Sequence, residues 1–203
     1  MTSRLLVLAA ALSFASCNTM SSGTRSGNVV KPHLNPARAE DRAILDAEKD
    51  AADQPDDVAV QIKLGSAYLY HGWYDQAIAI YEEVLAKAPD NAEAWNYLGL
   101  ANLRKGRADR ARKDFEHAIA ADPAYAEGHY NLAATYEAAR DFPNAIKHYK
   151  IAITADRSLA DRTLNPHARE SALLSVAVLS LYKDATGAMT LDPRVPEPPT
   201  STK

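Results

Sequence analysis

The stretch that decides the fold is Leu64-Gly65-x-x-Tyr68, because close variants of it return along the chain. Thirty-four residues later stand Leu98-Gly99, and after another thirty-four Leu132-Ala133-x-x-Tyr136. At fixed distances after each copy come an Ala, an aromatic residue and, in two cases, a Pro: Ala77, Tyr81 and Pro89; Ala111, Phe115 and Pro123; Ala145 and Tyr149. A constant period indicates repeated supersecondary units. We expect the small residues to allow close helix contact and the aromatic residues to fill the space between paired helices.

The composition supports an all-helical chain. Of 203 residues 39 are Ala, the strongest helix former, whereas only 8 are Gly and no run alternates between apolar and polar residues as strands do. One Cys excludes an internal disulfide and a thiolate zinc cluster. A formal charge of -3 gives no basic footprint, so nucleic acid is not an expected partner.

The periodic residues resemble the tetratricopeptide repeat, whose pattern is W-x2-L-G-x2-Y…A-x3-F…P. The match spans residues 58 to 157, and it departs from the pattern at Gln61 and His129, which stand at the Trp position. The resemblance implies an all-α fold, a right-handed solenoid of three full repeats with helical caps. The expected units are a capping helix at 36–57, repeats at 58–91, 92–125 and 126–159, a second cap at 160–187 and a disordered Pro-rich tail at 188–203.

The amino terminus predicts a lipid anchor. Arg4 precedes about ten apolar residues and the small residues Ala15 and Ser16, a pattern typical of a signal peptide. The arrangement resembles the bacterial lipoprotein box, which implies a signal peptide at 1–16, an acylated Cys17 and a membrane partner. The residue after Cys17 is Asn18, which by the same resemblance implies an outer membrane lipoprotein facing the periplasm. Residues 17–35 read as a flexible tether.

The first helix of each repeat lines the concave surface of such a solenoid, so the resemblance also predicts a groove. By helical spacing its lining would be Ile62, Ser66, Leu69 and Tyr70 from repeat one, Asn96, Leu100, Leu103 and Arg104 from repeat two, and Tyr130, Ala134 and Glu137 from repeat three. Apolar groups with a few amides and one Arg suit a protein or peptide ligand. The alternative is that about half of these residues only pack between helices.

The helix expected after Asn165-Pro166 is apolar around most of its circumference up to about Asp184. A helix of this kind must be buried on more than one side. Either it is a cap satisfied within the monomer, or it contacts a second copy of the chain in a homodimer.

The sequence offers no chemistry that would make the protein an enzyme. It has no G-x-S-x-G, no Gly-rich phosphate loop and no H-x-x-x-H spacing, so we expect no catalytic residue, no metal site and no cofactor. His117, His129 and His148 fall within repeats, where surface or inter-helix packing is the expected role.

The function expected is therefore a non-enzymatic adaptor for protein–protein interaction, held by lipid in the bacterial envelope. Its layout resembles that of lipoproteins of Flp/Tad pilus assembly and of type IV pilus pilotins, which implies assistance to a pilus or secretion complex. The alternatives are an adaptor for cell-wall hydrolases and a self-associating structural protein.

Overall fold

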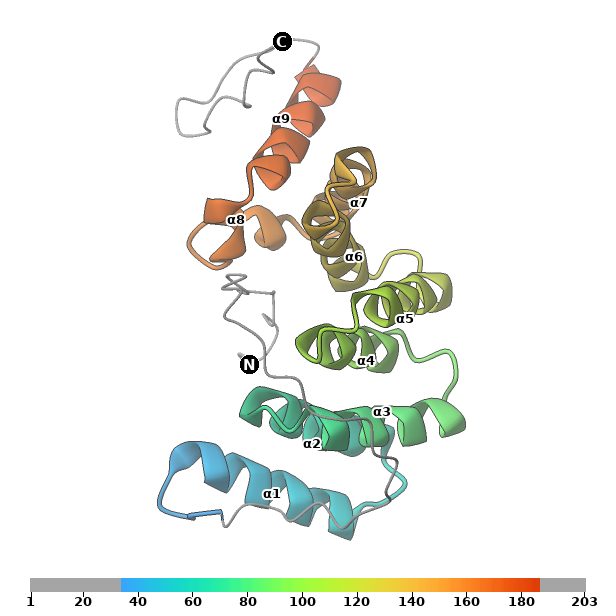
Figure 1. Cartoon of the computed structure of the whole chain (residues 1–203), viewed down its shortest axis with the longest axis vertical. Helices are drawn as coiled ribbons and strands as arrows, with labels where there is room; N and C mark the ends of the chain where they lie inside the picture. The colour runs from blue at the N-terminus through green and yellow to red at the C-terminus, as the bar shows by residue number, and fades with distance from the viewer. Residues whose placement is uncertain (1–33, 187–203) are drawn as a thin grey trace.

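The computed structural model describes residues 34–186, and every regular element in that part of the chain is helical. The expected signal peptide, Cys17, most of the tether and the Pro-rich tail lie outside the described residues. Figure 1 shows the helices stacked in a curved column, from α1 at one end to α9 at the other. They are α1 (Ala39–Asp53), α2 (Val58–His71), α3 (Tyr74–Lys87), α4 (Ala92–Arg104), α5 (Ala108–Ala121), α6 (Ala126–Ala138), α7 (Phe142–Ala155), the 3-10 turn η1 (Arg157–Ala160), α8 (His167–Glu170) and α9 (Ala172–Thr186).

The three pairs α2–α3, α4–α5 and α6–α7 confirm the expected solenoid fold. Their helices pack where a small residue meets a ring: a Cβ on Gly65 would lie 2.7 Å from the Tyr81 ring, and one on Gly99 2.5 Å from the Phe115 ring. Both rings, and that of Tyr149 in the third pair, are fully buried. The prediction that aromatic residues fill the space between paired helices is therefore confirmed.

The ends of the helices follow local sequence rules. The Asp57 carboxylate accepts the backbone N–H of Ala59 at the start of α2, and the Asn91 side chain accepts that of Ala94 at the start of α4, at 2.9 and 2.7 Å. Gly72 ends α2 with φ 84°, a left-handed conformation that favours glycine.

The residues at the Trp position explain why Gln61 and His129 preserve the repeat. The Gln61 amide donates to the Pro55 carbonyl at 3.3 Å, the Trp95 indole to Pro89 at 2.7 Å and the His129 imidazole Nε2 to Pro123 at 3.1 Å. Each side chain thus ties the first helix to the turn before it by one equivalent hydrogen bond. The position requires a donor of the right reach rather than an indole.

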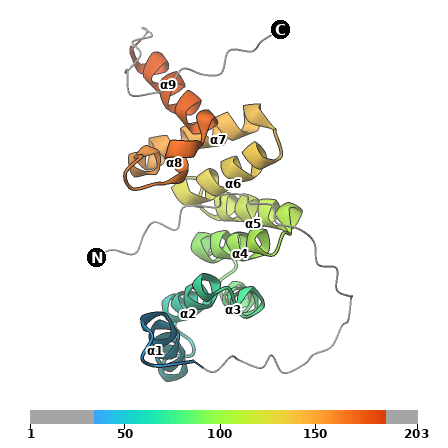
Figure 2. The ribbon, with the colours of Figure 1, turned by 60° about the vertical axis from the view of Figure 1, so that its left-hand side comes forward.

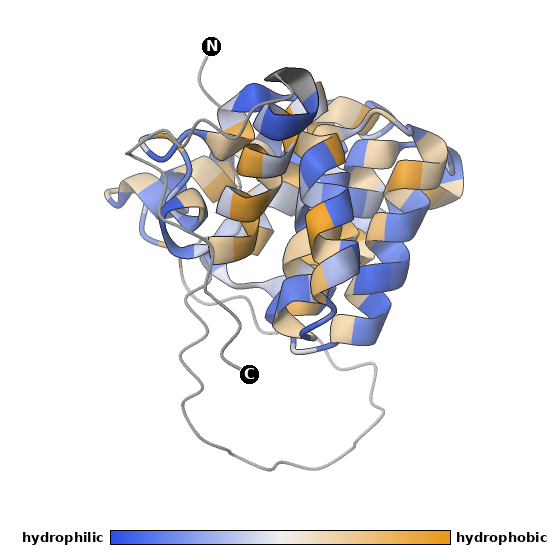
Figure 3. Ribbon diagram, turned by 90° about the horizontal axis from the view of Figure 1, so that it is seen from above, coloured by the Kyte–Doolittle hydropathy of each residue, from blue (hydrophilic) through white to orange (hydrophobic). Residues whose placement is uncertain are grey.

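The C-terminal cap differs from the expected single helix. Ser171, in extended conformation, separates α8 from α9, and its hydroxyl accepts the backbone N–H of Leu174 at 3.0 Å. The helix is interrupted at Ser171 because the hydroxyl of this residue caps a new helix. Apolar residues run along α9 in the view down the column (Figure 3), and one side of it packs on α7.

Candidate peptide-binding face

The first helices of the three repeats form one continuous side of the column. Helix α4 contacts α2 below it and α6 above it, so the three lie side by side (Figure 2). We call the surface made by α2, α4 and α6 the inner face. It is the surface on which the sequence predicted a ligand.

The structure brings the predicted groove residues to the inner face but leaves only some of them accessible. Tyr70 is 66% exposed, Arg104 is exposed, and Ser66, Leu103, Ala134 and Glu137 are partly exposed. The other five are buried: Ile62, Leu69, Asn96, Leu100 and Tyr130. The lining predicted for these five is corrected to packing between helices, because each residue is at most 7% exposed. Asn96 also lines the cavity described below.

Two of the buried residues receive hydrogen bonds that recur with the repeat. The Asn131 amide donates to the Asn96 side-chain oxygen at 2.8 Å, and the Asn165 amide donates to the Tyr130 hydroxyl at 2.7 Å. In each case an Asn bonds a residue thirty-five positions earlier. Asn165 therefore continues the repeat pattern into the cap.

The cap covers the inner face of the third repeat. The Tyr130 hydroxyl lies 2.7 Å from His167 Nδ1, and the Ser171 hydroxyl donates to Glu137 at 2.8 Å. Figure 2 shows α8 lying across this end of the column. Burial raises the pKa of Tyr130 and lowers the pKa of His167, so both groups are neutral here at neutral pH. The two exposed residues of the predicted lining, Tyr70 and Arg104, lie in repeats one and two.

A cavity of about 450 Å³ opens beside the inner face, between the starts of α4 and α6 and the end of α7. It is lined by Glu93, Asn96, Tyr97, Asp122, Ala124, Tyr125, Ala126, Glu127, Ala155 and Asp156. The sequence analysis missed all of these except Asn96. The signal that the sequence offered is the Asp in the turn after α5 and in the turn after α7, Asp122 and Asp156.

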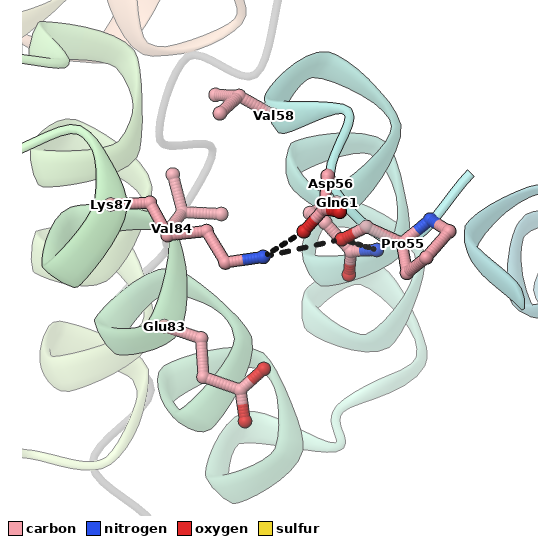
Figure 4. Close-up of a pocket in the computed structure, with 7 residues that line it drawn as sticks. All are labelled: Pro55, Asp56, Val58, Gln61, Glu83, Val84 and Lys87. Carbon is pink, nitrogen blue, oxygen red and sulfur yellow. Dashed lines mark hydrogen bonds and ion pairs between the residues drawn. The ribbon is translucent and has the colours of Figure 1, made fainter.

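Two further cavities lie away from the inner face. One, of about 260 Å³, sits at the turn between α1 and α2, where the Lys87 ammonium reaches from α3 to the Asp56 carboxylate at 2.8 Å (Figure 4). The other, of about 450 Å³, lies among α3, α4 and α5 and is lined by Trp95, Arg110 and Lys113 among others. In the first cavity this ion pair joins α3 to the turn between α1 and α2 and accounts for two of the polar groups that line it.

The histidines of the third repeat pair with each other. His129 Nδ1 and His148 Nδ1 are 2.9 Å apart, and His129 Nε2 must carry a proton because it faces the Pro123 carbonyl. His129 Nδ1 is therefore the acceptor and His148 Nδ1–H the donor. Burial lowers the pKa of both rings, that of His148 to about 4. Among the described residues no group of three or more His, Cys, Asp or Glu is placed to hold a metal.

No helix within residues 34–186 has both the length and the apolar character needed to cross a bilayer.

Comparisons with known proteins agree with this geometry. A family model described as tetratricopeptide repeat matches residues 62–125 and 103–160. No curated protein matches the chain. The solved structure MamA MSR-1 C2 is 30% identical, over 60% of this chain and 70% of its own, with a TM-score of 0.49.

Two other solved structures share the fold at lower identity. One, described as the crystal structure of MamA, is 24% identical over 72% of this chain and 91% of its own, with a TM-score of 0.52. The other, MamA 41-end from Desulfovibrio magneticus RS-1, is 24% identical over 60% and 69%, with a TM-score of 0.51. At this identity the likeness concerns the fold alone.

Proposed function

Because residues 62–160 consist of tetratricopeptide repeats, a module that binds protein partners, we propose that this protein is an adaptor that holds a protein partner on its inner face. The observation that carries the proposal is the side-by-side arrangement of α2, α4 and α6, with Tyr70 66% exposed and Arg104 exposed. An extended peptide would pack its apolar side chains against Tyr70 and Leu103, and Arg104 would pair with an acidic group. The adaptor role requires no chemistry from the chain.

The proposal places the adaptor at the periplasmic side of the outer membrane, anchored through acylated Cys17. Two signals support it: the only Cys of the chain follows a short apolar segment and two small residues, and Asn18 follows it. Tethering raises the local concentration of a bound partner near the membrane, which would assist assembly of a pilus or secretion complex. Cys17→Ala should move the protein to the soluble periplasmic fraction, and continued fractionation with membranes would contradict lipid anchoring.

The experiment that tests partner binding is photo-crosslinking in the native cell. A photoreactive amino acid replaces Tyr70 on the inner face, and the matched control carries it at Glu116, an exposed residue of α5. We expect a crosslinked partner at Tyr70 that the Glu116 control lacks. Equal crosslinking at both positions, or none at Tyr70, would contradict binding at the inner face.

The identity of the captured partner separates the alternatives. Pilus or secretion-pore subunits would support the assembly role, and wall hydrolases would support the hydrolase-adaptor role. Capture of the chain itself would support self-association through α9, which has one side on α7 and leaves Val176 and Leu179 partly exposed.

A further inference from the structure

The cavity beside the inner face differs in charge from the rest of the molecule. Four of the residues that line it are acidic: Glu93, Asp122, Glu127 and Asp156. None of the described residues that line it is Lys, Arg or His. The chain as a whole is close to neutral, with 23 basic and 26 acidic residues. The negative charge is therefore concentrated at this place.

Two of the carboxylates are oriented by the turns they occupy. One oxygen of Asp122 accepts the backbone N–H of Ala124 at 2.9 Å, and one oxygen of Asp156 accepts that of Ser158 at 2.8 Å. These bonds fix each carboxylate while leaving its second oxygen able to accept. Glu127, partly exposed in the first turn of α6, forms no hydrogen bond or ion pair with any residue that the structure describes.

Two tyrosine rings add an aromatic wall. Tyr97 stacks on Tyr81, with ring centroids 5.7 Å apart, and Tyr125 packs against Gly128 at the start of α6. Burial and, to a smaller extent, the negative charge of Glu93 raise the pKa of Tyr97 to about 12, so the phenol stays neutral. A neutral ring beside carboxylates attracts a cation through its negative face.

The wall of the cavity also carries an excess of hydrogen-bond acceptors. Asn96 lines the cavity and accepts from the Asn131 amide at 2.8 Å. Four carboxylates and an amide oxygen, with no basic side chain among the described lining residues, favour a ligand that donates hydrogen bonds and carries positive charge.

We infer that this cavity binds a lysine or arginine side chain of the partner's peptide. The inference rests on the proposed function and specifies it: the partner segment has apolar side chains for the surface around Tyr70 and Leu103, and a cationic side chain for the cavity. An anionic segment, such as a phosphopeptide or nucleic acid, is repelled by the same four carboxylates.

The test uses the full chain in detergent and three fluorescein-labelled peptides in which Ala alternates with Arg, Gln or Glu. Fluorescence anisotropy measures binding at low and at high salt. We expect the Arg peptide to bind, and the Gln and Glu peptides to bind at least about tenfold more weakly. High salt should weaken binding of the Arg peptide because salt screens the charges. Equal binding of the Arg and Gln peptides, or no binding of either, would overturn the inference.

Variants then assign the binding to the cavity. Glu127→Gln keeps the shape of the side chain and should weaken binding of the Arg peptide about tenfold. Tyr125→Leu should also weaken this binding. Glu116→Gln is the matched control, because it removes the same charge from an exposed place on α5 outside the cavity. Far-UV circular dichroism checks that each variant is folded. Equal losses in Glu127→Gln and Glu116→Gln would mean nonspecific attraction and would overturn the inference.

The failure of this inference is distinguishable from failure of the adaptor role. A partner crosslinked at Tyr70 whose capture is unchanged by Glu127→Gln would leave the adaptor role in place and overturn the cationic site. Arg-peptide binding that depends on Glu127, with no partner crosslinked at Tyr70, would support the site and contradict the adaptor role.

Discussion

Repeats two and three share one backbone plan but are held together by different chemistry. In repeat two the phenyl ring of Phe115 packs against Gly99 and has no polar atom. In repeat three Ala133 replaces that glycine, and the Tyr149 hydroxyl at the ring position donates to Glu137 at 2.7 Å. The comparison teaches that the last repeat exchanges some apolar packing for polar bonds, and that these bonds secure the cap.

The same difference recurs at the Trp position. The Trp95 ring stacks on His117 with centroids 4.5 Å apart, whereas His129 stacks on His148 at 5.2 Å and also accepts a hydrogen bond from it. At this position repeat two depends on ring stacking, and repeat three depends on ring stacking and on the protonation of its two histidines.

The largest expected effect is at the glycine of repeat two. Gly99→Ala should lower the free energy of unfolding by about 3 kcal/mol, because the new methyl group would lie 2.5 Å from the packed Phe115 ring. Ala133→Gly, at the same place in repeat three, should cost only about 1 kcal/mol, mostly through helix propensity. Urea unfolding followed by circular dichroism measures both.

A double variant sharpens this prediction. Phe115→Leu removes the ring that the new methyl group meets. The loss of unfolding free energy in Gly99→Ala/Phe115→Leu should therefore be smaller than the sum of the losses in the two single variants. Strict additivity would show that the glycine is not required by the ring.

The second effect concerns the polar bonds of repeat three. Glu137→Ala should cost about 2 kcal/mol, because it leaves the Tyr149 and Ser171 hydroxyls without their charged acceptor. Amide hydrogen exchange should become faster in α9 more than in α2, since the lost bonds join the third repeat to the cap. Equal stability of Glu137→Ala and an exposed control, Glu116→Ala, would contradict the structural role of Glu137.

The third effect is a dependence on pH with opposite sign in the two repeats. Burial lowers the folded-state pKa of His129 and of His148, the latter from 6.5 to about 4. Between these values the unfolded chain binds protons that the folded chain does not, so stability falls as the pH falls. We expect a loss of about 1.5 kcal/mol, less than the full shift implies because His148 is partly exposed.

In repeat two the buried carboxyl of Asp114 acts the other way. Burial raises its pKa, although a hydrogen bond from Asn102 at 2.7 Å opposes the rise, so its contribution to stability increases as the pH falls through that raised pKa. Urea unfolding from about pH 7 to about pH 4 tests both signs. On acidification the stability of wild type relative to His148→Gln should fall, and the stability of wild type relative to Asp114→Asn should rise.

The sequence predicted the elements that repeat and missed contacts that join different repeats. The spacing of Gly65, Gly99 and the aromatic residues after them predicted the paired helices, because each pair is a local unit with its own core. The burial of Tyr130 was not predictable in this way, since it depends on Asn165 and His167, which belong to a segment with no complete repeat pattern.

The cavity was missed for a related reason. Its lining combines turn residues of one repeat, such as Tyr125, with the end of the next pair at Asp156. Helical spacing describes one face of one helix, so it cannot bring together residues from three turns. The lipid anchor at Cys17 stays a prediction, because it lies outside the described residues.

The smallest expected effect is at the helix starts. The residue before α4 is Asn91, whose side chain accepts the backbone N–H of Ala94 at 2.7 Å, whereas the residue before α6 is Tyr125, which provides no side-chain cap. Asn91→Ala should therefore lower the free energy of unfolding by about 1 kcal/mol. Asn91→Asp should change it little, because a carboxylate also caps the helix and interacts favourably with its positive N-terminal end. If Asn91→Ala proved neutral, the hydrogen bond of Trp95 to Pro89 would suffice to hold this turn, as that of His129 to Pro123 does at the uncapped start of α6.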